Sequence, residues 1–213
     1  MARCTKTFEG STMIMHVTGL FIHPAKEWEA IRDTGDRASY KYYLPTLILA
    51  LIPAASTYIG TTKIGWTVSK NPTVVLTEAS AFIMSALMYF AILAGVVVMG
   101  IFIKWMSRTY SSSPSLSRCI AFSAYTATPI FFAGLTMLYP APVLIMLVGV
   151  AAIFYTIHFL YSGISIFMRI PEAEGFMFAS SILTVGMVML VALITITVLI
   201  LSFGFGSIYL FKV

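Results

Sequence analysis

Long apolar stretches, separated by short polar segments, make up most of this chain. Five of these stretches hold between 18 and 26 residues each. About 20 apolar residues, rising 1.5 Å per residue in a helix, cross the roughly 30 Å hydrocarbon core of a bilayer. We therefore predict an all-α fold, a polytopic integral membrane protein with five transmembrane helices. In chain order, the predicted spans cover residues 42–59, 79–103, 117–138, 143–168 and 178–201.

The third and fourth stretches form the longest uncharged part of the sequence. No Lys, Arg, Asp or Glu lies between Arg118 and Arg169. Only Tyr139-Pro140-Ala141-Pro142 separates the two stretches, and two prolines in so short a segment favour a tight turn. We expect a transmembrane helical hairpin here.

The segment before the first span has a different, amphipathic pattern. Over residues 13–33, apolar positions recur near the helical spacing, and His23-Pro24 interrupts them. Trp28 and Ile31 then lie three residues apart on one side of the second part. Two interpretations stay open, because an amphipathic helix suits a lipid surface and a protein surface equally well. The segment is either a bent helix in the membrane interface or a helix packed on the protein's own cytoplasmic loops.

The distribution of basic residues predicts the orientation of the chain. With five crossings, ten of the thirteen Lys and Arg residues fall on the side of the N-terminus. Cytoplasmic segments of membrane proteins are enriched in Lys and Arg. We therefore expect the N-terminus in the cytoplasm and the C-terminus on the outer side. Residues 1–40 are predicted to be a cytoplasmic segment that contains the amphipathic helix, and residues 41–213 to be the transmembrane domain.

Aromatic and basic residues near the ends of apolar segments are predicted to act as interfacial anchors. Trp28 lies in the amphipathic segment, and Lys104, Trp105 and Arg108 follow the second span. Such side chains keep their polar ends in the headgroup region and attract anionic lipids. Membrane lipids are therefore expected partners. The net charge of +5 is explained by these positions, and no nucleic acid is expected to bind.

Composition and motifs argue against several other classes of protein. Hydrophobic residues make up 59% and charged residues 10% of the chain, whereas soluble domains contain about 25% charged residues. Cys4 and Cys119 are the only cysteines, so neither a structural disulfide nor a metal cluster is expected. The sequence contains no His-Glu-x-x-His, Gly-x-Ser-x-Gly or P-loop motif. We predict no enzymatic activity, no cofactor and no metal site.

His158 is the imidazole that lies deepest in an apolar stretch. Tyr155 and Ser162, at positions i−3 and i+4, share its helix face. An ionisable side chain in a membrane helix usually points into the bundle and can belong to a proton-linked or ligand-linked site. The alternative is a neutral imidazole that donates one hydrogen bond to a neighbouring helix. We favour this alternative, because no second intramembrane carboxylate or base is present as a partner.

Pro129 interrupts the third span and is a second polar feature. It removes a backbone hydrogen bond and frees a carbonyl about one turn earlier, near Tyr125. Thr126 or Thr128 could compensate in part. The proline is either a kink required for packing or a hinge beside a small polar cavity. The candidate intramembrane polar site therefore consists of His158, Tyr125, Tyr155, Ser162 and Pro129.

Several short motifs resemble the Ypt/Rab-interacting-protein (Yip) domain family in its bacterial branch. They cover roughly residues 15–200 and comprise Phe21-Ile22-His23-Pro24 with Trp28 and Ile31, Ala124-Tyr125 with Pro129, and Tyr161-Ser162-Gly163. The resemblance implies a five-helix polytopic domain and, for the bacterial branch, a location in the inner membrane. Eukaryotic relatives act in vesicle transport with small GTPases and carry an acidic Gly-Pro motif in a longer cytosolic tail. This chain has no match to that motif, so GTPase binding is not expected.

Two functions follow as expectations. The first is a non-enzymatic inner-membrane scaffold that acts on lipids or partner membrane proteins. The second is a small oligomeric transporter or channel in which Tyr125, Pro129 and His158 line a polar path. Ala91-x-x-x-Gly95 in the second span permits close helix approach, so a homo-oligomer is also considered.

Overall fold

A computed structural model gives the fold of the chain and describes residues 19, 24–33, 39–65, 73–110, 112–139, 141–202 and 209–212. Most of the predicted helix before Pro24, the loop around Trp66 and the Gly-rich segment after the last span lie outside the described residues. The described part consists of helices and two short strands. In chain order these are α2 (Pro24–Asp33), α3 (Ser39–Ile59), η2 (Gly60–Ile64), β1 (Thr73–Leu76), α4 (Glu78–Ser107), η3 (Arg108–Tyr110), α5 (Leu116–Thr126), α6 (Thr128–Ala133), η4 (Gly134–Leu138), α7 (Pro142–Met168), α8 (Glu172–Ser202) and β2 (Tyr209–Lys212).

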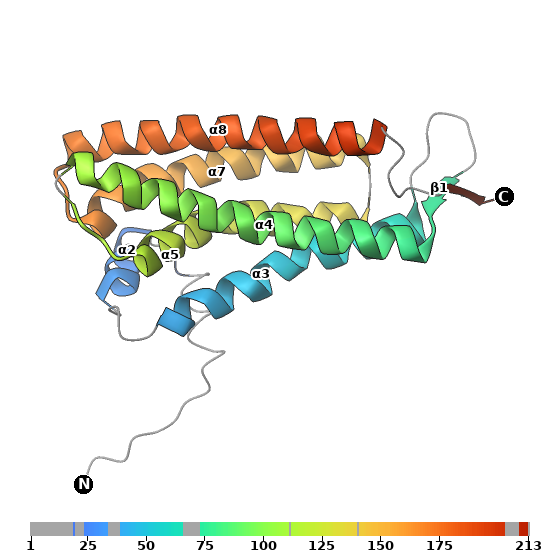
Figure 1. The fold of residues 1–213 in the computed structure, drawn as a ribbon, viewed down its shortest axis with the longest axis horizontal. Coiled ribbons are helices and arrows are strands. Elements are labelled where there is room, and N and C mark those ends of the chain that lie inside the picture. Colours follow the sequence, from blue (N-terminus) through green and yellow to red (C-terminus); the bar gives the residue numbers. More distant parts are fainter. Residues whose placement is uncertain are drawn as a thin grey trace, which may run out of the picture.

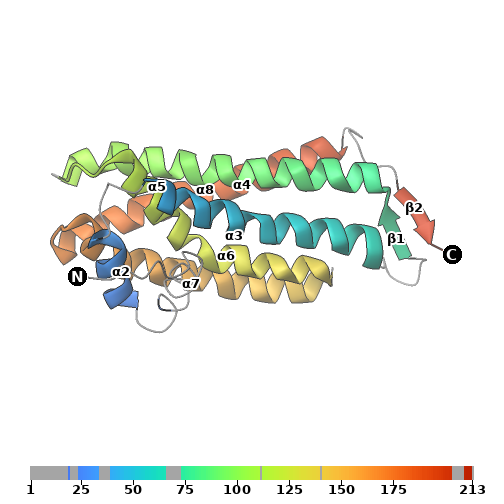
Figure 2. The same ribbon diagram turned by 90° about the horizontal axis from the view of Figure 1, so that it is seen from below.

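The long helices lie side by side in an elongated bundle (Figures 1 and 2). Four of the described helices are long and apolar enough to cross a membrane, and the bent pair that starts at Leu116 makes a fifth when it is counted as one span. The predicted all-α, polytopic membrane fold is therefore confirmed. The predicted hairpin is also present, since η4 ends at Leu138 and α7 begins at Pro142. Proline suits this first helical position because its missing N–H would have no partner there.

The third span is broken near its middle. Its two parts, Leu116–Thr126 and Thr128–Leu138, meet at an angle of 42°. Pro129 stands in the first turn of α6 and cannot donate to the carbonyl of Tyr125. The Thr128 hydroxyl donates to the Ala124 carbonyl at 3.4 Å and so compensates in part for the break. The proline kink expected from the sequence is thus a full interruption of the helix.

The two strands show that this broken span crosses the whole bundle. β1, which precedes α4, pairs antiparallel with β2, which follows α8, from Thr73 opposite Lys212 to Leu76 opposite Tyr209. Paired strands lie on the same side of the membrane, so an even number of crossings separates them. The spans between them are α4, the broken pair, α7 and α8. If the broken pair entered the membrane and returned to the same side, only three crossings would separate the strands. The strands would then lie on opposite sides of the membrane and could not pair.

The end of the broken span confirms this arrangement. Gly60, at the end of α3, is packed so closely on η4 that a Cβ there would overlap the backbone of Met137. The exit of α3 and the exit of the broken span therefore lie at one end of the bundle. β2 lies at this end and α2 at the other (Figure 1). This arrangement fits the predicted odd number of crossings, and the orientation of the two termini stays a prediction.

We expect chemical labelling to settle this orientation. In a protein with Cys4 and Cys119 replaced by serine, Lys63→Cys and Glu172→Cys place single thiols at opposite ends, both at exposed positions. A membrane-impermeant maleimide added to spheroplasts should label the cysteine at position 63 and leave the one at position 172 unlabelled until the membrane is opened. Labelling of position 172 alone would reverse the orientation, and equal labelling of both would contradict the odd number of crossings.

Candidate functional site

The structure places His158 on the outer surface of the bundle. Its side chain is exposed and packs edge-on against Tyr155, with 6.0 Å between ring centroids. Tyr155 is itself 37% exposed. The two residues therefore share a face of α7, as expected from their spacing. In a membrane this face meets lipid, so it forms no part of an interior path.

Of the other three residues of the candidate polar site, Ser162 lies one turn further along α7, and the other two are buried in the interior. The Ser162 hydroxyl donates to the Phe159 carbonyl of its own helix at 3.3 Å. Tyr125 is buried in the largest apolar core, and Pro129 is buried at the break of the third span. The structure therefore does not bring the five residues together. In an apolar span the spacing of polar residues predicts a shared helix face, but it does not predict which way that face points.

We expect His158→Leu to have little effect on the folded protein. The imidazole is exposed on an apolar surface, and substitutions at such positions change stability by roughly 0.5 kcal/mol or less. Equilibrium unfolding in mixed micelles measures this change. A loss above about 2 kcal/mol would contradict the exposed position and would return His158 to an interior role.

The amphipathic helix α2 packs on the protein and not on lipid. Trp28 is 0% exposed and Ile31 2% exposed. The Trp28 ring contacts Phe122 of α5 at 4.9 Å and Phe167 of α7 at 5.8 Å between centroids. Gly163 makes room for it, since a Cβ at this position would overlap the indole ring. Of the two interpretations of this segment, the structure places α2 against the protein, and Trp28 does not serve as a lipid anchor.

Two arginines hold the C-terminal end of α2. The Arg118 guanidinium donates to the Arg32 carbonyl at 3.1 Å, and Arg32 donates in turn to the Ile166 carbonyl at 3.1 Å. Arg118 also lies over the Phe167 ring, 5.7 Å from its centroid. The last carbonyls of a helix have no partner within the helix and carry partial negative charge. Arg118 therefore stabilises the C-terminal end of α2 in two ways: it donates a hydrogen bond to a free carbonyl, and its positive charge offsets the negative end of the helix dipole.

The outer face of α2 remains open. Lys26 and Glu29 are exposed, on the side of the helix away from Trp28. Trp105, at the end of α4, is 64% exposed, and Arg108 is also exposed. Lys104 is partly buried. Lys104, Trp105 and Arg108 thus lie at the end of α4, where the sequence predicted interfacial anchors. Their contact with lipid headgroups stays a prediction.

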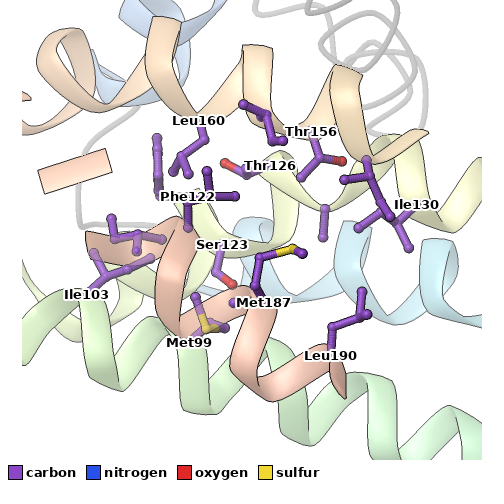
Figure 3. Close-up of a pocket in the computed structure, with 16 residues that line it drawn as sticks. Met99, Ile103, Phe122, Ser123, Thr126, Ile130, Thr156, Leu160, Met187 and Leu190 are labelled. Atoms are coloured by element: carbon purple, nitrogen blue, oxygen red, sulfur yellow. The ribbon is translucent and has the colours of Figure 1, made fainter. Parts of the chain in front are cut away.

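A pocket of about 200 Å³ lies between α4, α5, α7 and α8 (Figure 3). Its walls are almost entirely apolar, and Ser123, Thr126 and Thr156 are its only hydroxyl residues. None of the five residues of the candidate polar site lines it. Among the described residues, no three His, Cys, Asp or Glu side chains lie close enough together to hold a metal ion.

Thr126 and Thr156 are the residues that sequence reasoning missed. Both hydroxyl oxygens are buried and have no hydrogen-bond partner among the described residues. The sequence singled out Tyr125 and Tyr155, and each threonine is the next residue along the chain. Thr126 was considered only as a partner for the carbonyl freed by Pro129. Isolated threonines are common in apolar spans, so the sequence carried no stronger signal for them.

The comparisons with known proteins agree with this architecture. The Yip1 domain matches residues 18–194. The inner membrane protein YohC of Escherichia coli strain K12 is 41% identical over 190 residues, which are 89% of this chain and 97% of that protein. The same protein from E. coli O6:H1 strain CFT073 matches equally well. No solved structure matches the chain significantly. The chain therefore belongs to the Yip1 domain family and is a multi-pass protein of the inner membrane.

Proposed function

We propose that this protein is a non-enzymatic scaffold of the inner membrane, which binds partner membrane proteins or lipids at the end of the bundle that bears α2. The proposal rests mainly on one observation: Trp28 is fully buried, while Lys26 and Glu29 on the opposite side of the same helix are exposed. A helix fixed in this way presents its polar face in a constant position. Binding to a preformed surface costs little ordering of the chain.

Other charged residues extend this surface. Arg108 follows α4, Arg169 follows α7, and Glu172 and Glu174 lie in the first turn of α8, all of them exposed. They are at the same end as α2, because α2 packs on the last turns of α7 through Gly163 and Ile166. Mixed charges around a few exposed apolar residues are typical of the rim of a protein interface.

The alternative of a transporter or channel has less support. A polar path requires polar side chains that line a common cavity. His158 is exposed on the outside of the bundle, and neither it nor Tyr125 nor Pro129 lines the pocket between α4, α5, α7 and α8. Proton- or ion-coupled flux by the purified protein in liposomes, lost in His158→Ala, would overturn the scaffold proposal.

Site-specific crosslinking in intact cells tests the proposed surface. A photoreactive amino acid at Glu29 should form a discrete protein or lipid adduct, because this position is exposed on α2. The matched control is Phe90, which is 66% exposed and lies in the half of α4 farther from the α2 end of the bundle. The adduct should be lost in Trp28→Ala, which releases α2. Absence of any adduct at Glu29, or the same adducts at Phe90, would contradict the proposal.

A further inference from the structure

We propose that the pocket between α4, α5, α7 and α8 binds an uncharged lipid that carries a hydroxyl or carbonyl oxygen able to reach the middle of the bilayer, such as a long-chain alcohol or a quinone. The proposal concerns the interior of the bundle and is independent of the scaffold surface at α2. It rests on two unpaired hydroxyls, on the apolar walls of the pocket, on its depth and on its opening toward lipid.

Among the described residues, three buried hydroxyls have no hydrogen-bond partner, those of Ser85, Thr126 and Thr156, and of these the two threonines line the pocket. Most described threonines and serines of the spans donate to a carbonyl one turn earlier in the same helix. Thr57, Thr61, Thr128, Thr184 and Thr195 all do so, at 2.7 to 3.4 Å. Thr126 Oγ1 and Thr156 Oγ1 make no such bond and have no partner among the described residues. A buried hydroxyl without a partner is costly, so these two are suited to bind a ligand.

Both threonines lie in the wall of the same pocket. Thr126 is 7% exposed and comes from α5, and Thr156 comes from α7. In the view of Figure 3 they lie on one side of the pocket, while Met187 and Leu190 of α8 lie on the other. A ligand in the pocket would therefore meet the two threonines on one side and, apart from Ser123, apolar side chains on the remaining walls. A hydroxyl can both donate and accept, so either an alcohol or a carbonyl oxygen can bind there.

The pocket lining determines the charge and size of the ligand. No lining residue is ionisable, so a charged group would be buried without a counter-ion, at high cost. The ligand must therefore be neutral. An apolar cavity of about 150 Å³ binds benzene, so the 200 Å³ available here holds one ring or a short piece of chain. Only one end of a lipid is enclosed, and the rest extends out of the bundle.

The pocket reaches the lipid-facing surface. Two of its lining residues are strongly exposed, Ile130 at 40% and Met187 at 45%. Both are apolar and lie in membrane-spanning segments, so the opening faces hydrocarbon and not water. A ligand enters sideways from the bilayer. This route selects molecules that are already dissolved in the membrane.

The depth of the threonines excludes an ordinary phospholipid as the bound species. Thr156 lies near the middle of the 27-residue helix α7, which places it roughly 20 Å from either end. The ester and headgroup oxygens of a phospholipid stay at the interface, about 15 Å from the bilayer centre. An acyl chain could fill the pocket but would leave both hydroxyls unpaired. A neutral single-chain or isoprenoid lipid can carry its oxygen to this depth.

Photolabelling of the full-length protein in liposomes tests the proposal. The probes are hexadecanol with a diazirine near its hydroxyl group, hexadecane with the same diazirine, and a phosphatidylcholine with the diazirine in one acyl chain. The alcohol should label the segments around Thr126 and Thr156 about tenfold more than the alkane does, because it forms two additional hydrogen bonds. The double variant T126V/T156V keeps the shape of both side chains, and it should reduce labelling by the alcohol to the level of the alkane.

A pair of glycine variants provides a control that leaves the threonines in place. Gly186 lines the pocket, and a Cβ there would meet only the Met99 side chain, at 3.8 Å. Gly186→Leu should therefore fill the pocket and abolish labelling without a backbone clash. Gly149→Leu, on a side of α7 where a Cβ meets no described atom within 4 Å, should leave labelling unchanged. Each variant is compared by its melting temperature, so loss of fold is recognised.

Two results would overturn the proposal. If the alkane or the phosphatidylcholine probe labels the pocket as strongly as the alcohol, and the double variant has no effect, then ordinary acyl chains fill this space. If no probe labels these segments in folded protein, the pocket binds no lipid. Neither result bears on the crosslinks expected at Glu29, so the two proposals fail separately.

Discussion

Trp28→Ala should be the most destabilising single substitution in the amphipathic helix. Truncation of a fully buried tryptophan costs about 3–5 kcal/mol, because burial is lost and a cavity remains. Here the indole ring fills the space between Phe122, Phe167 and Gly163, and with Ile31 it joins α2 to the largest apolar core. We expect a loss of this size in equilibrium unfolding, or release of α2 while the spans stay folded. Faster tryptic cleavage after Lys26 and Arg32 would report that release.

Two further variants separate packing from other effects. Trp105→Ala removes the same side chain at a position that is 64% exposed, and it should change stability by about 0.5 kcal/mol or less. Trp28→Phe should be milder than Trp28→Ala, because the indole Nε1 has no hydrogen-bond partner to lose among the described residues. Equal effects of Trp28→Ala and Trp105→Ala would show that α2 is not held by its tryptophan.

The spans could be predicted from the sequence because bilayer thickness sets their length. The predicted stretches 143–168 and 178–201 correspond closely to α7 and α8. The turn at Tyr139–Pro142 followed from its prolines. The pairing of β1 with β2 could not be predicted in the same way. Each strand has only four residues, and the partners lie more than 130 residues apart, so no local pattern indicates that they meet.

The direction in which each helix face points could not be predicted. For this reason the polar site predicted from the sequence does not coincide with the pocket in the structure. In a soluble helix the polar face marks the solvent side. In a membrane helix both the lipid side and the packed side are apolar, since lipid tails are as apolar as leucine. The sequence around His158 therefore fits an inward face and an outward face equally well. The same ambiguity hid Thr126 and Thr156, whose neighbours Tyr125 and Tyr155 were singled out in their place.

Buried Trp28 lies between the two proposed sites, the exposed face of α2 and the pocket inside the bundle. Neither proposal depends on the other. Its ring packs on Phe122, and Phe122 also lines the pocket between α4, α5, α7 and α8. α2 therefore closes the α2 end of the bundle next to the pocket. The apolar core beneath α2 continues directly into the pocket wall.

Gly100→Leu should disrupt the packing of the second and third spans. A Cβ at Gly100 would lie 2.8 Å from Cα and 3.0 Å from the backbone N of Ile120, so α4 and α5 would have to move apart. Overpacking of this kind costs about 1–3 kcal/mol or more, because backbone cannot rotate away as a side chain can. The expected result is a loss of at least this size in mixed-micelle unfolding. Cys119, which is fully buried on α5 beside this contact, should also react faster with a maleimide.

Gly95→Leu is the matched control for this substitution. It makes the same change five residues earlier in α4, where a Cβ would meet no described atom within 4 Å. The sequence offered Ala91-x-x-x-Gly95 as a motif for close helix approach in a homo-oligomer, which stays a prediction; Ala91 is exposed, and within the chain the close approach occurs at Gly100. Leucine at position 95 should therefore leave stability and Cys119 reactivity nearly unchanged, since it adds an apolar side chain to a surface that faces lipid. If Gly95→Leu were as damaging as Gly100→Leu, a partner would have to cover this surface, and a second copy of the chain would be the first to test by crosslinking.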